Sequence, residues 1–198
     1  MRPTQLRPRA AVPALFTSCK CEIGVSILHQ PLLRHALEQA ALDPSVRAIR
    51  YRAGPIIECP PLSLHGVVLH RVDGRFLLRV YETRPVRSGD QLARFTHVLQ
   101  RYGLRLLERD SSEIRREPLF TNSRLVWSYA RCPVSLSDRL RIALALEEWG
   151  PQSFAELESR ARPSCDIVAA LCALACADLV SLNIHHIPLG RYTVVSAR

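Results

Sequence analysis

The sequence predicts an α/β protein in which a mixed β-sheet domain precedes a small helical domain ending in a β-hairpin. Residues 76–107 read as apolar strand, amphipathic helix and apolar strand, the pattern of a right-handed crossover between parallel strands. Asp73-Gly74 predicts a tight hairpin immediately before that crossover. Beyond Cys132-Pro133, three capped helical segments and two short apolar runs predict a winged helix.

Length and charge support a division into two domains. We expect a basic, loosely ordered arm over residues 1–22, the mixed-sheet domain over 23–132 and the winged-helix domain over 134–198. Residues 1–133 hold 21 basic and 11 acidic residues, whereas the remainder holds six and seven. An attraction to DNA, if present, therefore belongs to the first domain. All basic residues except Lys20 are arginine, which suits phosphate recognition but which a GC-rich genome also produces.

The chain lacks the sequence features of membrane insertion and secretion. No apolar run reaches the roughly 18 residues that a bilayer-spanning helix needs. The basic N-terminus has no long apolar segment behind it, as a secretory signal would. We therefore expect a cytoplasmic protein with no membrane partner.

The elements of the first domain follow from apolar periodicity and from turn residues. Ser88 and Asp90 begin the crossover helix, and Gly103 follows its end as a left-handed terminator. Pro31 opens the first helix at a position where proline is tolerated. The helices and strands expected here are 31–41 (helix), 46–51, 56–57 and 62–69 (strands), 76–81 (strand), 88–102 (helix) and 104–107 (strand).

The second domain is predicted from its caps. Ser135 or Ser137 starts a helix that runs to Trp149, and Ser153 to Glu156 is a capping box for the next helix. Ser164 is expected to cap a third helix over residues 165–177. Runs at 180–184 and 192–195 complete a two-stranded wing. The third helix offers no basic or amide side chain to DNA, so we expect this domain to pack against the chain or dock a partner.

The segment Glu82-Thr83-Arg84 directly follows the strand predicted over residues 76–81. A nuclease of the restriction-endonuclease fold binds Mg²⁺ between two carboxylates, with a lysine two residues beyond the second acid at a strand end. Glu82 has the place of that acid, and Arg84 stands where the lysine would be. A guanidinium has a pKa above about 12, so Arg84 can hold a phosphate oxygen but cannot act as a base. The alternative is that Glu82 is a solvated acid at a strand end.

Several stretches resemble the TnsA-type endonuclease subunits of heteromeric transposons, and the resemblance covers about four fifths of the chain. The clearest is SEIRREPLFTNSRLVW; the matching stretches are residues 37–55, 77–87, 111–129, 173–180 and 188–195. The resemblance implies a restriction-endonuclease-like fold and Mg²⁺-dependent cleavage of one DNA strand.

By position, the resemblance also implies roles for particular residues. Glu38 resembles the family's helix-borne acid, Glu82 the strand acid and Arg84 the lysine. The family's middle aspartate falls near His65 in one alignment and near Asp73 in another. The implied metal ligands are therefore Glu82, Glu38 and Asp73, with Arg84 steadying the phosphate.

Further arginines are candidates for contacts with DNA phosphates. These are Arg87, Arg115, Arg116 and Arg124. The resemblance implies DNA as a partner, together with a transposase or a transposition regulator that binds the second domain. Two other functions remain open: a non-catalytic DNA-binding or regulatory module, and a small protein-interaction module whose arginines have no role with nucleic acid.

Overall fold

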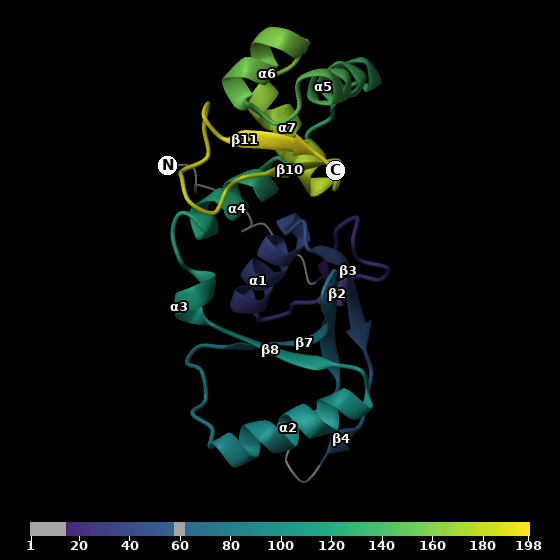
Figure 1. Ribbon diagram of the computed structural model, residues 1–198, viewed down its shortest axis with the longest axis vertical. Coiled ribbons are helices and arrows are strands. Elements are labelled where there is room, and N and C mark those ends of the chain that lie inside the picture. Colours follow the sequence, from purple (N-terminus) through teal and green to yellow (C-terminus); the bar gives the residue numbers. More distant parts are fainter. Residues whose placement is uncertain (1–14, 58–61) are drawn as a thin grey trace, which may run out of the picture.

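The computed structural model of the protein describes residues 15–57 and 62–198. Figure 1 shows an elongated molecule with a lower lobe built on a sheet and an upper lobe of helices and short strands. Helix α4 (Leu119–Ser128) lies between the two lobes. The predicted mixed α/β class is confirmed. Residues 1–14, most of the predicted basic arm, lie outside the described residues.

The lower lobe contains a four-stranded mixed sheet in the order β3-β6-β7-β8. Its strands are β3 (Val46–Arg52), β6 (Gly66–Arg71), β7 (Gly74–Tyr81) and β8 (Arg105–Asp110). The first three are antiparallel neighbours, and β8 runs parallel to β7. Both the hairpin at Asp73-Gly74 and the parallel crossover are therefore confirmed.

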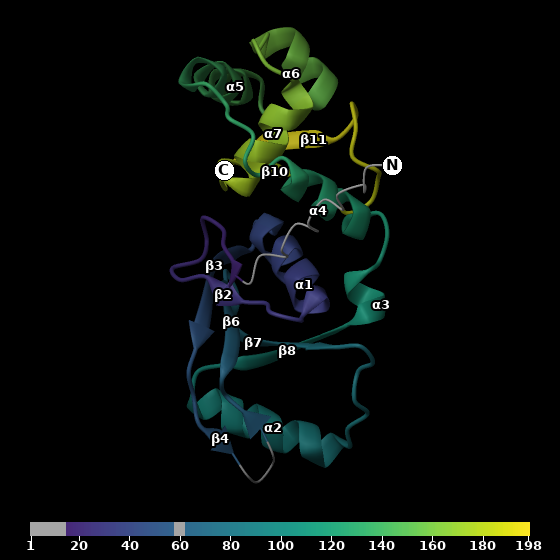
Figure 2. The same ribbon diagram turned by 180° about the vertical axis from the view of Figure 1, so that it is seen from behind.

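A helix covers each face of this sheet (Figures 1 and 2). Helix α1 (Pro31–Leu42) packs on the face that carries Val67, Leu69 and Leu78. Helix α2 (Gly89–Arg101) packs on the opposite face, against Val68 and Leu77. Because neighbouring residues of a strand point to opposite faces, the continuous apolar runs of β6 and β7 supply both cores.

Two expectations about the lower lobe are wrong in detail. The single strand expected over 62–69 is divided: β5 (Leu62–Ser63) pairs with β4 (Ile56–Ile57), and β6 begins only at Gly66. Gly66 has a φ of 152°, which glycine tolerates and other residues rarely adopt.

The expectation of a loosely ordered arm is also wrong for residues 15–22, the part of the arm that the structure describes. Strand β1 (Leu15–Phe16) pairs with β2 (Val25–Ser26), and Phe16 and Lys20 are each 5% exposed. The ring of Phe16 lies 5.3 Å from that of Trp127 in α4, so this segment is packed against the rest of the protein.

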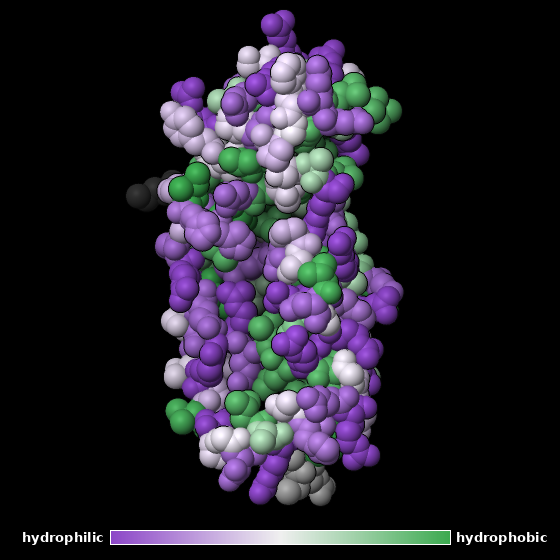
Figure 3. Space-filling view, in the orientation of Figure 1, coloured by the Kyte–Doolittle hydropathy of each residue, from purple (hydrophilic) through white to green (hydrophobic). Residues whose placement is uncertain are grey.

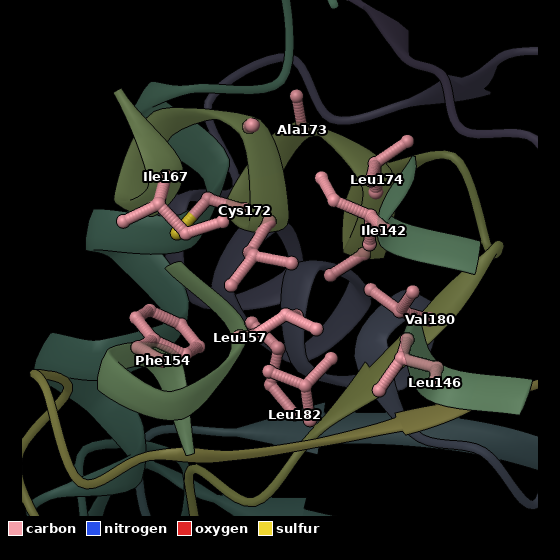
Figure 4. Packing of buried hydrophobic residues seen from close by; sticks show 14 of the residues in the cluster. Ile142, Leu146, Phe154, Leu157, Ile167, Cys172, Ala173, Leu174, Val180 and Leu182 are labelled. Carbon is pink, nitrogen blue, oxygen red and sulfur yellow. The ribbon is translucent and has the colours of Figure 1, made fainter. Parts of the chain in front are cut away.

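The upper lobe follows a short helix, α3 (Ser111–Ile114), and then α4. Its elements in order are α5 (Leu136–Trp149), β9 (Gln152–Ser153), α6 (Phe154–Ala161), α7 (Ile167–Cys176), β10 (Val180–Leu182) and β11 (Val194–Ala197). The three strands form an antiparallel sheet in the order β10-β11-β9. Phe154, Leu157 and Leu182 are among the buried side chains that fill this lobe (Figure 4).

The caps of the upper lobe are predicted well with one exception. Ser135 caps α5, and Ser153 with Glu156 forms the expected capping box. The third helix is capped by Asp166 and not by Ser164, whose amide and hydroxyl instead donate to Asp138. Within the described residues, none of the helices combines the length and apolar character needed to cross a bilayer.

Candidate functional site

The strand-end segment is held by polar contacts with β8 and α3. The Glu82 carbonyl accepts a hydrogen bond from the Ser111 hydroxyl at 2.7 Å. Arg84 pairs with Glu113 at 2.5 Å and donates to the Glu108 carbonyl at 2.9 Å. The Arg84 guanidinium is therefore already engaged by protein groups, while the Glu82 side chain is exposed to solvent.

The Arg87 guanidinium is also engaged by protein groups. Its guanidinium pairs with the Glu108 carboxylate, donates to the Tyr81 hydroxyl and lies 5.0 Å from the Phe95 ring centroid. The hydrogen bond to Glu108 raises the pKa of Arg87. Only 18% of its side chain is exposed, so Arg87 connects the start of α2 to β8 and presents little of its charge to a ligand.

Asp73 lies at the turn of the β6–β7 hairpin, at the end opposite Glu82. The eight residues of β7 separate the two acids by roughly 25–30 Å at about 3.3 Å per residue. Asp73 pairs locally with Arg71 at 3.2 Å. The strand geometry therefore excludes one ion shared by Asp73 and Glu82. His65, the other candidate, precedes β6 and bonds to the Tyr51 hydroxyl.

Glu38 lies on α1 and is 5% exposed. It accepts a hydrogen bond from Arg34 Nε at 2.9 Å, and its backbone carbonyl accepts one from Trp127 Nε1 at 2.9 Å. Desolvation raises the pKa of Glu38, although Arg34 opposes this shift. Burial of this kind disfavours the ionised carboxylate that Mg²⁺ binding requires, and the Arg34 guanidinium already occupies one of its oxygens.

The strand positions that face α1 do not supply the missing ligands. They are occupied by the aliphatic residues Val67, Leu78 and Val80. Among the described residues, no three His, Cys, Asp or Glu side chains are placed to hold a metal ion. The expected magnesium site of Glu82, Glu38 and Asp73 is therefore not assembled, and these residues do not fit the ion that the family resemblance implies.

Glu38 instead opens onto a groove of ≈ 750 Å³ between α1 and α4. One wall is α1 with the segment before it, and the other is the exposed side of α4. The residues that line the groove are Ile27, Leu28, His29, Gln30, Pro31, Arg34, His35, Glu38, Arg124, Trp127 and Ser128. A second groove of ≈ 700 Å³ shares Arg34, Glu38 and Trp127 with it and extends toward Arg131. We call the first of these the α1–α4 groove.

The charges of three arginines act on His35, which lines the α1–α4 groove. Desolvation lowers the pKa of His35, and the charges of Arg124, Arg115 and Arg34 lower it further. Arg115 and Arg124 are exposed, and Arg34 is half-buried. His35 packs edge-on against Phe120, whose ring also lies 5.6 Å from the Arg124 guanidinium. Because Glu38 is the only acid among the described residues that line this groove, the site is electropositive.

Of the four arginines expected to contact DNA, Arg124 lines this groove, and Arg115 is close enough for its charge to act on His35. Arg115 and Arg124 act together on His35, whereas Arg87 is held beside β8. Arg116 is exposed and lines a separate cleft of ≈ 510 Å³ together with His185. The arrangement at the α1–α4 groove is suited to holding an anion.

Sequence reasoning missed Arg34 and His35, although the sequence contains a signal for both. Pro31, Arg34, His35 and Glu38 are spaced at i, i+3, i+4 and i+7, so they share one face of the predicted first helix. That face carries charged and polar groups beside the apolar face that packs on the sheet. The opposing wall, from α4, depends on a contact between distant segments that the spacing does not reveal.

Comparisons of the chain with protein-family models, with curated proteins and with solved structures give no significant match.

Proposed function

We propose that the protein binds DNA through the α1–α4 groove, as a non-catalytic relative of the TnsA-type endonuclease subunits. The observation that carries the proposal is that Arg124 lines the groove beside His35, together with Arg34, which is paired with Glu38. The charge of the exposed Arg115 also acts on His35. Guanidinium groups bind phosphate oxygens through paired N–H donors, and a concave surface with one buried acid favours a polyanion over a neutral ligand.

The topology of the lower lobe supports the proposed relationship. A helix is followed by an antiparallel meander of three strands, a crossover helix and a parallel fourth strand. This is the order expected of the restriction-endonuclease-like domain that the sequence resemblance implies. The proposed nuclease fold then accounts for the sheet and its two helices, and the altered residues account for a loss of cleavage.

We further propose that the upper lobe is a winged helix that docks a protein partner, such as a transposase or a regulator subunit. A helix, a strand, two helices and a two-stranded hairpin follow one another, and the last strand pairs with the first. In a DNA-reading winged helix, the third helix would enter the major groove. Helix α7 has that place, but eight of its ten residues are buried, which favours a packing role.

The direct test is DNA binding by single-arginine variants, measured by fluorescence anisotropy with a labelled duplex. We expect Arg115→Ala and Arg124→Ala each to weaken binding by roughly tenfold at low salt, the scale of one lost charge-assisted hydrogen bond. Arg94→Ala is the matched control, because Arg94 is an exposed arginine on α2, away from the groove. Equal losses from all three variants, or no binding by the wild type, would refute the proposed interface.

The absence of catalysis is tested separately. Supercoiled plasmid incubated with the protein and Mg²⁺ or Mn²⁺ should remain uncut, because the α1-facing strand positions carry no metal ligand. Metal-dependent nicking that Glu82→Ala abolishes would show that the strand-end acid is catalytic after all.

A further inference from the structure

Helix α5 carries a row of leucines that its own lobe does not cover. Leu136, Leu140 and Leu144 are 72%, 54% and 61% exposed. Residues four apart lie on one side of a helix, so the three form a single stripe. Ile142 and Leu146, on the other side, belong to the core of the lobe (Figure 4). Figure 3 shows apolar residues gathered at the upper right, where Figure 1 places α5.

The stripe continues into a shallow apolar groove. This groove has a volume of ≈ 450 Å³ and lies between α5 and the segment that leads into β10. Ala143, Leu174 and Leu179 are among the residues that line it, and Leu179 is 50% exposed. A continuous apolar surface of this kind on a soluble lobe marks an interaction site.

The charges on α5 are separated along the helix. Arg139 and Arg141 lie in its first half, and Glu147 and Glu148 lie in its last two turns. Asp138 breaks the pattern in sequence but not at the surface, because it is 1% exposed and accepts hydrogen bonds from serines within the lobe. Within the described part of the chain, neither Arg139 nor Glu147 has an ion-pair partner.

We propose that this face binds the same face of a second copy of the chain, with the two α5 helices antiparallel. Arg139 and Glu147 each lie four residues from Ala143 on the same row of the helix. A twofold axis beside Ala143 therefore sets each Arg139 opposite the other copy's Glu147, and forms two equivalent ion pairs. The small Ala143 side chain lets the helices approach, and Leu140 and Leu144 of the two copies interdigitate.

Charge complementarity selects this occupant and this orientation. A parallel pairing would place arginine beside arginine and glutamate beside glutamate, which is unfavourable. The antiparallel pairing matches opposite charges at both ends without any group from another protein. The surface is complementary to itself, and the dimer follows from α5 alone, independently of DNA binding.

Sedimentation velocity on the full chain without DNA tests the proposal. The wild type should shift from its monomer mass of 22.3 kDa toward twice that mass as its concentration rises. Leu144→Arg and Glu147→Arg should each remain monomeric, because one places a charge in the stripe and the other sets arginine against arginine. The double variant R139E/E147R should recover the dimer, since it restores the opposite pairing. Circular dichroism confirms that each variant is folded.

The matched control is Val86→Arg, which adds a charge at a fully exposed apolar residue outside the upper lobe and should leave the dimer intact. A wild type that stays monomeric up to about 1 mM would overturn the proposal, since its self-affinity would then be weaker than about 4 kcal/mol. A dimer that persists in Leu144→Arg would also overturn it, because the contact would then lie on another surface.

Discussion

Glu38 is a carboxylate whose burial makes its ionised form less favourable than it is in water. It is 5% exposed, and desolvation outweighs the hydrogen bond from Arg34, so its pKa is raised. A metal-binding acid is ionised, and burial opposes that form while Arg34 supports it. The burial of Glu38 and its pairing with Arg34 therefore argue against the role of metal ligand that the family resemblance implies.

The neutral variant Glu38→Gln should make the protein more stable at pH 7, because the desolvation that raises the pKa of Glu38 is a cost only to the ionised form. The folded state retains the Glu38 proton to a higher pH than the unfolded chain, so wild-type stability falls as pH rises from 4.5 through the raised pKa. The gain should disappear below pH 4.5, where both states are protonated. Urea unfolding of the wild type and the variant at pH 4 and pH 7 measures this difference in stability. A variant that is less stable than the wild type at pH 7 would contradict the raised pKa of Glu38.

Asp138 is the opposite case. It accepts a hydrogen bond from the Ser164 amide at 2.9 Å and bonds to the hydroxyls of Ser135 and Ser164, and these bonds lower its pKa to about 2. Its ionised form therefore stabilises the folded state above pH 3.8, and this contribution is lost as pH falls toward 2.

Asp138→Asn should lower the melting temperature at pH 7 and flatten its dependence on pH between about 4 and 2. Thermal unfolding followed by circular dichroism at several pH values measures both effects. Ser137→Ala is the control, since Ser137 is an exposed neighbour on the same helix. An unchanged pH profile in Asp138→Asn would show that Asp138 does not link α5 to Ser164.

At the scale of elements, most helix and strand positions could be predicted because the signals are local. Ser88 and Ser153 mark helix starts through hydrogen bonds to the residue three positions on, and Pro31 marks one through its fixed φ at the first helical position. The predictions failed where a residue distant in the sequence determines which side chain caps a helix. Ser164 binds Asp138, and this leaves Asp166 to cap α7.

The bounds of the last strand were also predicted incorrectly, because a turn before it extends further than the apolar pattern indicates. Apolar residues predict a strand over 192–195, but β11 spans Val194–Ala197. The Thr193 side chain accepts a hydrogen bond from the Gly190 amide, and the Thr193 amide donates to the Gly190 carbonyl, so the turn extends two residues further. Tyr192 is 72% exposed as a consequence and does not enter the strand.

Helix α4 connects the upper lobe to α1, and Asn122 provides the polar part of this connection. Asn122 is 2% exposed; its amide donates to the carbonyls of Ile184 and Ile187 and accepts from the Leu189 amide. We expect Asn122→Ala to destabilise the protein by about 2–4 kcal/mol, because it leaves these buried backbone groups without partners. Chemical denaturation measures the loss, with the exposed Ser128→Ala as the control. A loss below about 0.5 kcal/mol would show that water replaces the amide.

At the scale of the whole molecule, part of the candidate site could be predicted and part could not. The sequence identified Arg124 and Glu38, which line one groove, and Arg115, whose charge acts on His35 in the same groove. It also grouped Glu38 with Glu82 and Asp73, which the fold keeps apart. Residue type and strand position suggested a metal site, but the length of the β6–β7 hairpin places Asp73 far from Glu82. The contact between α1 and α4, which places Glu38 beside Arg124, could not be predicted from the sequence.

The central claim is that the α1–α4 groove binds a polyanion through its arginines, and the salt dependence of DNA binding tests it most directly. The logarithm of the binding constant falls linearly with the logarithm of salt concentration, and each phosphate contact contributes a slope of about 0.9. The double variant R115A/R124A should reduce the wild-type slope by about 2, whereas R94A should leave it unchanged. A slope that R115A/R124A does not change, in a protein that still binds DNA, would contradict the account.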